Sequence, residues 1–339
     1  MFDGCELIKS LNLTNLHTEN IEDLEFLFDE CRSLEEINLS NFKTEKAINM
    51  RGLFSNCVQL KSLNLKSFNT KNVKNMAYMF SNCVSLINLD ISSFNTENVE
   101  NMECLFFNLT SLSSLDVSNL NTEKVKNMSS MFHRCKLLKS LDLSNFKTEN
   151  VETMFNMFSE CQFESLDLSN FNTEKVKEMD KMFLLCSSLK TLNIKNFNTK
   201  NLTSMNEMFS GCENLKELDL SSFDTRNVKS MSNMFSQCKS LDTINLSNFN
   251  TSNLEIMQDM FAGCASLVKL DLSHFDMKKI ENMKSTFADC KNLETIKLPE
   301  INKQNIAYDG IFYNCTSLKA EFPFFEKQIA NKKPGCLIF

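Results

Sequence analysis

A repeat of 25 or 26 residues runs along nearly the whole of this 339-residue sequence. It is clearest in a column of cysteines at Cys5, Cys31, Cys57, Cys83, Cys135, Cys161, Cys186, Cys212, Cys238, Cys264, Cys290 and Cys315. The one double-length gap, after Cys83, holds Leu109 at the expected position, and a phenylalanine lies three residues before every member of the column. Units this short cannot bury their own apolar side chains. The pattern therefore predicts a stack of similar coils that share one continuous core.

The first half of each unit has the spacing of a short helix. In residues 70–94 the apolar positions are Val73, Met76, Met79 and Phe80. This spacing is typical of one face of a helix. Thr70 stands where an N-cap would, and Asn82, just before the column cysteine, is typical of a left-handed residue that ends a helix. We therefore expect one short helix in each unit.

The second half of each unit has the alternation of a strand. Leu89 and Ile91 alternate with the polar residues Asp90 and Ser92, so the leucine and isoleucine are expected to face inward. Stacked in register, roughly twelve such units predict an α/β solenoid, with a parallel β-sheet on one face and short helices on the other.

The unit follows the pattern NMxxMFxxCxSLxxLDLSxFxTxxV and closely resembles the BspA-like leucine-rich repeat proteins, specifically the DUF285 type of repeat. The resemblance covers about residues 1–320 and implies a solenoid of the leucine-rich-repeat type. It also implies a surface-exposed or secreted ligand binder, with adhesion to host matrix proteins such as fibronectin and fibrinogen as a function of several members.

Composition argues against several other classes of protein. The chain is 42% hydrophobic and 23% charged, so it can bury a core. Its 6 glycines leave few phosphate-binding loops or strained turns for an enzyme. A net charge of −7 argues against nucleic acid as a partner. No apolar stretch is long enough to span a membrane, and the first residues lack the basic and apolar regions of a signal peptide.

Neither the cysteines nor the histidines form a recognisable reactive site. Stacked thiols could be read as a metal ladder or a disulfide framework, but no pair has zinc-ligand spacing, and Leu109 in the column fits packing. His17, His133 and His274 lie at unrelated positions of different repeats. We expect a reduced core column, no bound metal, no cofactor and no catalytic residue.

The outward side chains of the strands form the candidate binding site. Because side chains alternate along a strand, the residue between each pair of inward aliphatic residues points outward. We select the following members of this column as ligand-binding residues: Asp90, Asp116, Asp142, Asp167, Asp219, Asp271, Asn64, Asn193 and Asn245. The partner we expect is a protein. A divalent cation held along the aspartates is an alternative.

The two ends of the chain carry further expectations. The first residues start inside a unit without a polar cap, so we expect either that upstream sequence is missing or that a partner or a second copy of the chain covers the first coil. Residues 1–319 are expected to form the solenoid, and residues 320–339 a C-terminal cap and tail. The tail ends in Cys336-Leu337-Ile338-Phe339, which matches the C-a-a-X prenylation motif at Cys336.

Three functions follow from these features. The first is a non-enzymatic scaffold for protein–protein interaction, tethered to the cytoplasmic face of a membrane through a prenylated Cys336. The second is a secreted or cell-surface adhesin that binds host matrix proteins. The third is a structural solenoid that assembles end to end through its first coil.

Overall fold

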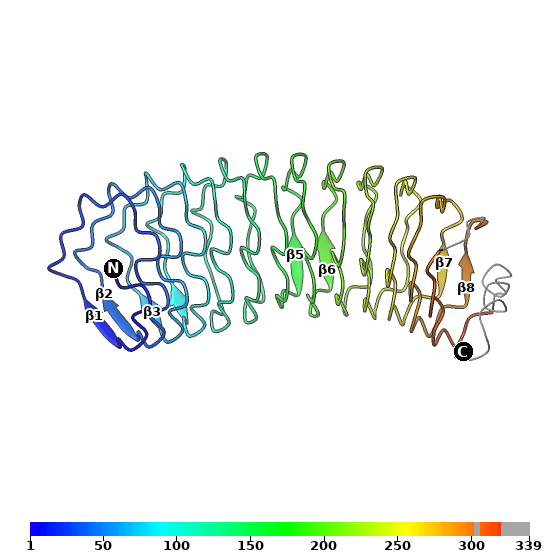
Figure 1. Ribbon diagram of the computed structural model, residues 1–339, viewed down its shortest axis with the longest axis horizontal. Helices are drawn as coiled ribbons and strands as arrows, with labels where there is room; N and C mark the ends of the chain where they lie inside the picture. Colours follow the sequence, from blue (N-terminus) through cyan, green and yellow to red (C-terminus); the bar gives the residue numbers. More distant parts are fainter. Residues whose placement is uncertain (302–305, 320–339) are drawn as a thin grey trace.

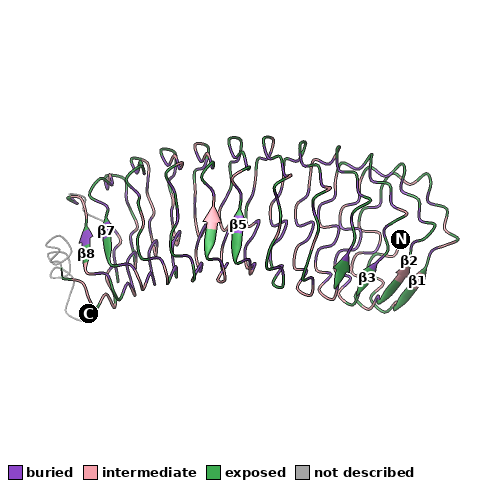
Figure 2. Ribbon diagram, turned by 180° about the vertical axis from the view of Figure 1, so that it is seen from behind, coloured by how far each residue is buried: buried purple, intermediate pink, exposed green. Residues whose placement is uncertain are grey.

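The computed structural model describes residues 1–301 and 306–319. Successive coils lie side by side and form an elongated, gently curved solenoid, with β1 near one end and β8 near the other (Figure 1). Buried and exposed residues alternate around every coil (Figure 2). The repeat in the sequence is therefore a repeat in space, and each residue lies beside its counterpart 25 or 26 residues away.

The strands form parallel pairs along one face of the solenoid. Their bounds are β1 Ser10–Asn12, β2 Glu36–Asn38, β3 Ser62–Leu63, β4 Asn88–Leu89, β5 Ser165–Asp167, β6 Thr191–Asn193, β7 Lys269–Asp271 and β8 Thr295–Lys297. The pairs are β1–β2, β3–β4, β5–β6 and β7–β8, and the inward residues stand opposite each other, as Leu166 does to Leu192. The described residues thus contain four short pairs rather than one sheet of about twelve strands. Each strand is only two or three residues long, and a turn follows it within a few residues.

The expected helices are absent from the described part of the chain. Residues 76–83 instead form two successive tight turns, in which the Met79 N–H donates to the Met76 carbonyl and the Cys83 N–H to the Phe80 carbonyl. Intervening amides donate to the next coil, as Phe80 N–H does to the Leu105 carbonyl at 3.2 Å. A helix cannot form because a left-handed residue interrupts the segment twice, at Tyr78 (φ 61°) and Asn82 (φ 59°).

We call this pair of turns, together with its counterpart in every other coil, the turn edge. Left-handed residues recur there at the two positions of each coil, with Gly52 and Asn56 as the preceding example. Just before the turns, single residues form a ladder of parallel bridges, such as Asn75 to Asn101 and Asn101 to Asn127. The face predicted to be helical is therefore an irregular second ladder whose main chain is bonded from coil to coil.

The core is built from columns of identical side chains. The phenylalanines three residues before the cysteine column stack ring on ring, as Phe132 does on Phe158 at 5.8 Å between centroids and Phe158 on Phe183 at 5.9 Å. All three rings are fully buried. Methionine and leucine columns pack around this stack, so that most of the buried apolar surface lies between neighbouring coils.

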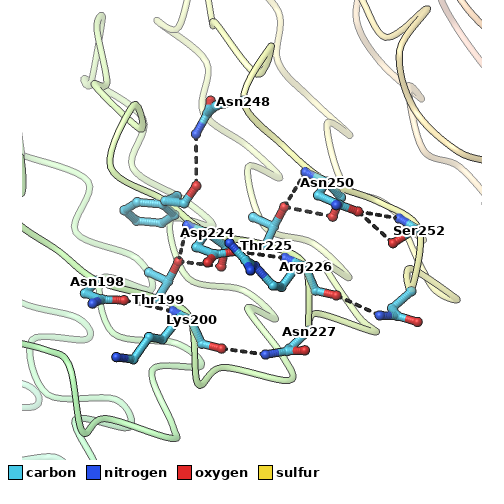
Figure 3. Close-up of polar contacts among 12 residues, drawn as sticks. Asn198, Thr199, Lys200, Asp224, Thr225, Arg226, Asn227, Asn248, Asn250 and Ser252 are labelled. Atoms are coloured by element: carbon cyan, nitrogen blue, oxygen red, sulfur yellow. Dashed lines mark hydrogen bonds and ion pairs between the residues drawn. The ribbon is translucent and has the colours of Figure 1, made fainter.

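The recurring threonine joins coils and does not cap a helix. The Thr199 hydroxyl donates to the Asp224 carbonyl oxygen at 2.9 Å and accepts from the Asp224 N–H at 2.8 Å (Figure 3). Thr225 makes the same two bonds to the main chain of Asn250, at 2.9 Å and 2.8 Å. These threonines are at most 1% exposed. Each hydroxyl therefore satisfies one donor and one acceptor of the following coil.

Candidate ligand-binding face

The structure places the selected aspartates and asparagines in one row along the strand face, one per coil. Eight of the nine are exposed, and Asn193 is half-buried. We call this row the strand-face strip; it consists of Asp90, Asp116, Asp142, Asp167, Asp219, Asp271, Asn64, Asn193 and Asn245. Nothing tests whether these residues bind a ligand, so this assignment stays a prediction.

Each member of the strand-face strip also holds the turn that follows it in its coil. The Asp116 Oδ1 accepts the Ser118 N–H at 2.9 Å, and Asp142 does the same with Ser144. The Asn64 Oδ1 accepts the N–H of Lys66 at 3.3 Å. One side-chain oxygen is thus engaged within the coil, which orients the side chain and leaves the rest of its polar group available to a ligand.

The aspartates of the strip are held in the charged form. Hydrogen bonds from the Ser118 hydroxyl and N–H lower the pKa of Asp116, and the corresponding bonds from Ser144 lower that of Asp142. Asp271 differs, because its carboxylate also pairs with Lys297 at 2.9 Å. The carboxylates of the middle coils therefore form an ionised acidic row at neutral and mildly acidic pH.

The strand face is hollowed at its N-terminal end, beside Asn64 and Asp90 of the strip. A shallow hollow of 390 Å³ lies over β1 and β2, and a second of 220 Å³ lies over β3 and β4. Asn64 borders both. The first is lined by Ser10, Leu11, Asn12, Glu36, Ile37, Asn38, Leu39, Ser40 and Asn64. Sequence reasoning did not predict these hollows, because every coil has nearly the same strand pattern.

The alternative of a divalent cation gains no support from the geometry. Among the residues that the structure describes, no group of three or more His, Cys, Asp or Glu side chains could hold a metal ion. The reason is the repeat itself, since each coil contributes a single carboxylate to the row and calcium requires six to eight oxygen ligands.

The cysteine column lies in the core, as the packing interpretation requires. The thirteen cysteines in the described ranges are free thiols, and most are fully buried. Cys186 Sγ lies 3.0 Å from the Phe158 carbonyl oxygen of the preceding coil, to which its S–H donates. Burial raises the pKa of Cys186 to about 12, so this thiol stays protonated and unreactive in the folded protein.

The three histidines are far apart in the fold. His17 is exposed and lies 3.6 Å from Glu19. The Nε2 of His274 lies 2.9 Å from the Leu246 carbonyl oxygen. His133 is buried in the turn edge, where its ring stacks on Phe107. The structure brings no two of them together.

The turn edge carries aromatic and arginine side chains that the sequence analysis did not select. The Arg51 guanidinium lies over the Phe26 ring at 5.0 Å and over the Tyr78 ring at 5.4 Å. The Tyr78 hydroxyl donates to Glu103 Oε1 at 2.7 Å. Phe155, on the same edge, is 37% exposed. The sequence feature that could have revealed these residues is their variation from repeat to repeat, because the core columns stay nearly constant.

Comparison with known proteins agrees with the repeat and the fold. The family described as Mycoplasma protein of unknown function, DUF285, matches residues 1–115, 105–217 and 203–323. No curated protein matches the chain. In the described ranges, no helix is long and apolar enough to cross a membrane.

Several of the solved structures that the chain resembles are bacterial leucine-rich repeat proteins. One from Bacteroides ovatus is 20% identical, with a TM-score of 0.54 over 94% of this chain and 79% of that one. A leucine-rich cell surface protein from Faecalibacterium prausnitzii is 17% identical, with a TM-score of 0.45 over 92% and 82% of the two chains. A leucine-rich repeat protein from Eubacterium ventriosum is also 17% identical, with a TM-score of 0.44 over 93% and 78%. With DUF285 matches along nearly its whole length, the chain belongs to the DUF285 family of BspA-like leucine-rich repeat proteins.

Proposed function

We propose that this protein is a non-enzymatic, surface-type binding protein that presents its strand face to a protein ligand. The observation that carries the proposal is the strand-face strip, a row of exposed polar side chains with one oriented residue in each coil. A flat face of this length matches an extended or repetitive partner better than a small molecule. The middle coils, from Asp90 to Asp167, favour a partner surface with basic side chains.

Neutralising the middle of the strip is expected to weaken binding. In the variant Asp90→Asn, Asp116→Asn, Asp142→Asn, Asp167→Asn, each asparagine keeps the oxygen that holds the turn, as Asn64 and Asn245 do naturally. Fibronectin and fibrinogen are the ligands to test, because the family resemblance implies matrix proteins. We expect affinity to fall about tenfold or more, mainly through slower association, and the salt dependence of binding to decrease. Surface plasmon resonance measures both.

A second quadruple variant serves as the matched control. Glu97→Gln, Glu123→Gln, Glu149→Gln, Glu174→Gln removes the same charge from exposed residues outside the strip. It should bind like the wild type. Equal loss in both variants would mean that net charge alone drives association and would remove the strip from the proposal. A wild-type protein that binds neither matrix protein would exclude matrix adhesion.

A membrane-tethered scaffold is the other function that the sequence predicts. Its anchor, Cys336, lies outside the described residues, and the comparisons give no support to prenylation. Mass spectrometry of the C-terminal peptide from native cells decides between the membrane-tethered scaffold and the surface binding protein. A prenylated Cys336 that has lost Leu337, Ile338 and Phe339 would place the solenoid on a cytoplasmic membrane face, and an intact terminus would favour the surface protein.

Self-association through the first coil stays a prediction as well. Met1 is 86% exposed and Leu7 is 89% exposed in that coil, which gives it apolar surface that a second copy could cover. Light scattering over a range of protein concentrations tests this. A constant monomer mass at all concentrations would contradict it.

A further inference from the structure

His133 stands at a position of the turn edge where seven of the twelve other coils carry serine or alanine and the preceding coil carries Phe107. Counterparts at this position include Ser81, Ser159, Ser210 and Ser236. The His133 side chain is only 10% exposed, and its ring stacks on Phe107 of the preceding coil with 5.0 Å between centroids and 10° between planes. This coil thus holds a buried imidazole ring at a position where no other coil has a histidine.

The one carboxylate beside His133 is already shared by two other cations. Its Nε2 lies 3.7 Å from Glu160 Oε1. That carboxylate already binds Arg134, whose Nε lies 2.9 Å from both of its oxygens, and Lys136 lies 3.6 Å from it. Phe107, on the other side of the ring, contributes no charge. A protonated His133 would therefore be the third cation at a single carboxylate.

The same place holds most of the unpartnered buried polar atoms of the described residues. Among the described residues, four buried side-chain nitrogen or oxygen atoms lack a hydrogen-bond partner, and three of them lie in this coil and the next: His133 Nδ1, Asn156 Oδ1 and Ser159 Oγ. The fourth, Ser222 Oγ, belongs to another coil. Because an unpartnered buried polar group favours exposure to water, this boundary opens more easily than one closed by apolar side chains.

We propose that His133 is an acid-sensitive latch of the turn edge. When its ring is neutral, the boundaries on either side of its turn are closed over Phe107. When its ring is protonated, residues 129–137 open to water. The bonds that opening breaks are known. The Asn108 N–H donates to the His133 carbonyl at 2.7 Å, and the Arg134 N–H donates to the Ser159 carbonyl at 2.9 Å. The latch thus controls one coil in the middle of the solenoid.

The pH window follows from the direction of the shift. Burial lowers the pKa of His133, Arg134 and Lys136 reinforce this effect, and Glu160 and the Asn156 side chain oppose it. An opened His133 titrates near the ordinary value of about 6.5. Opening therefore takes up a proton. The closed state is fully favoured at a pH above the pKa of the opened His133, and it loses stability as the pH falls through that pKa. The loss ends once the pH passes below the lowered pKa of the closed state. Within this window the open population rises by up to about tenfold for each pH unit.

Hydrogen exchange read by mass spectrometry at pH 7 and pH 5 tests the latch on the full chain. After correction for intrinsic exchange rates, we expect peptides covering residues 129–137 to open several-fold more at pH 5 than at pH 7. The variant His133→Ser, which carries the side chain found at Ser159 in the following coil, should lose this pH response. His274→Asn, a substitution that restores the residue found at Asn145 and Asn248, should keep it.

Two results would overturn the proposal. One is the same pH response in the wild type and in H133S. The other is a His133 ring that titrates at or above about 6.5 in the folded protein, measured from its NMR chemical shift, since this would mean that Glu160 stabilises the charged ring. The NMR measurement needs only the wild type, so it decides the matter even if H133S does not fold.

Discussion

Replacing Phe158 by alanine is expected to lower the free energy of unfolding by about 3–5 kcal/mol. The Phe158 ring is fully buried and stacks on Phe132 and Phe183, while the edge of Phe163 packs against it. Truncation therefore removes packing from two coil boundaries at once and leaves a cavity inside a continuous column. Because each coil touches only its neighbours, a defect in the middle of the stack weakens the connection between its two halves.

Phe155→Ala is the matched control, because Phe155 lies three residues earlier in the same coil and is 37% exposed. It should cost less than about 1 kcal/mol. Urea unfolding followed by circular dichroism gives both values. Similar losses in the two variants would contradict the view that the ring column is the main source of stability.

Replacing Thr199 by valine is expected to lower the free energy of unfolding by about 2–4 kcal/mol, although valine has nearly the same shape. The hydroxyl both donates to and accepts from the main chain of Asp224 in the next coil. Valine would leave an N–H and a carbonyl group of Asp224 without this partner, and each buried unpartnered group costs about 1–3 kcal/mol.

Thr199→Ser separates hydrogen bonding from packing, because serine keeps the hydroxyl and loses only a methyl group. We expect a loss of about 1 kcal/mol or less for this variant. Thermal and urea unfolding of the two proteins under identical conditions make the comparison. If serine and valine destabilise equally, the methyl group and not the hydroxyl joins the coils.

The repeat, the solenoid and the core columns could be predicted from the sequence, because the period of 25 or 26 residues forces equivalent residues to stack. Phe80, Cys83 and Leu89 are buried as expected. The cysteine column was also correctly interpreted as packing, since Leu109 occupies its place in one coil and is equally buried.

The predicted helices were wrong for a physical reason. Apolar residues at Val73, Met76, Met79 and Phe80 fit one face of a helix, but two tight turns of three or four residues produce the same spacing. What distinguishes them is a left-handed residue within the segment. Tyr78 gives no hint of one, because a large side chain rarely adopts positive φ. Asn82 was correctly predicted to be left-handed, although it closes a turn and not a helix.

The candidate site was predicted only as a row of side chains. Alternation along the strand places Asp116 and Asp142 outside, and the structure agrees. The hollows beside Asn64 and the environment of His133 depend on how individual coils differ from their neighbours, which a repeat pattern averages away.

The direction of the hydrogen bonds determines how the molecule responds to pulling along its long axis. Within a coil, the main chain makes mostly short-range turns, whereas the threonine hydroxyls and many amides bond to the following coil. Tension therefore loads all bonds of one boundary together, and successive boundaries carry the load in series. When one boundary breaks, its 25 or 26 residues can extend by about 80–95 Å at 3.3–3.6 Å per residue. The solenoid is thus built to lengthen one coil at a time under load.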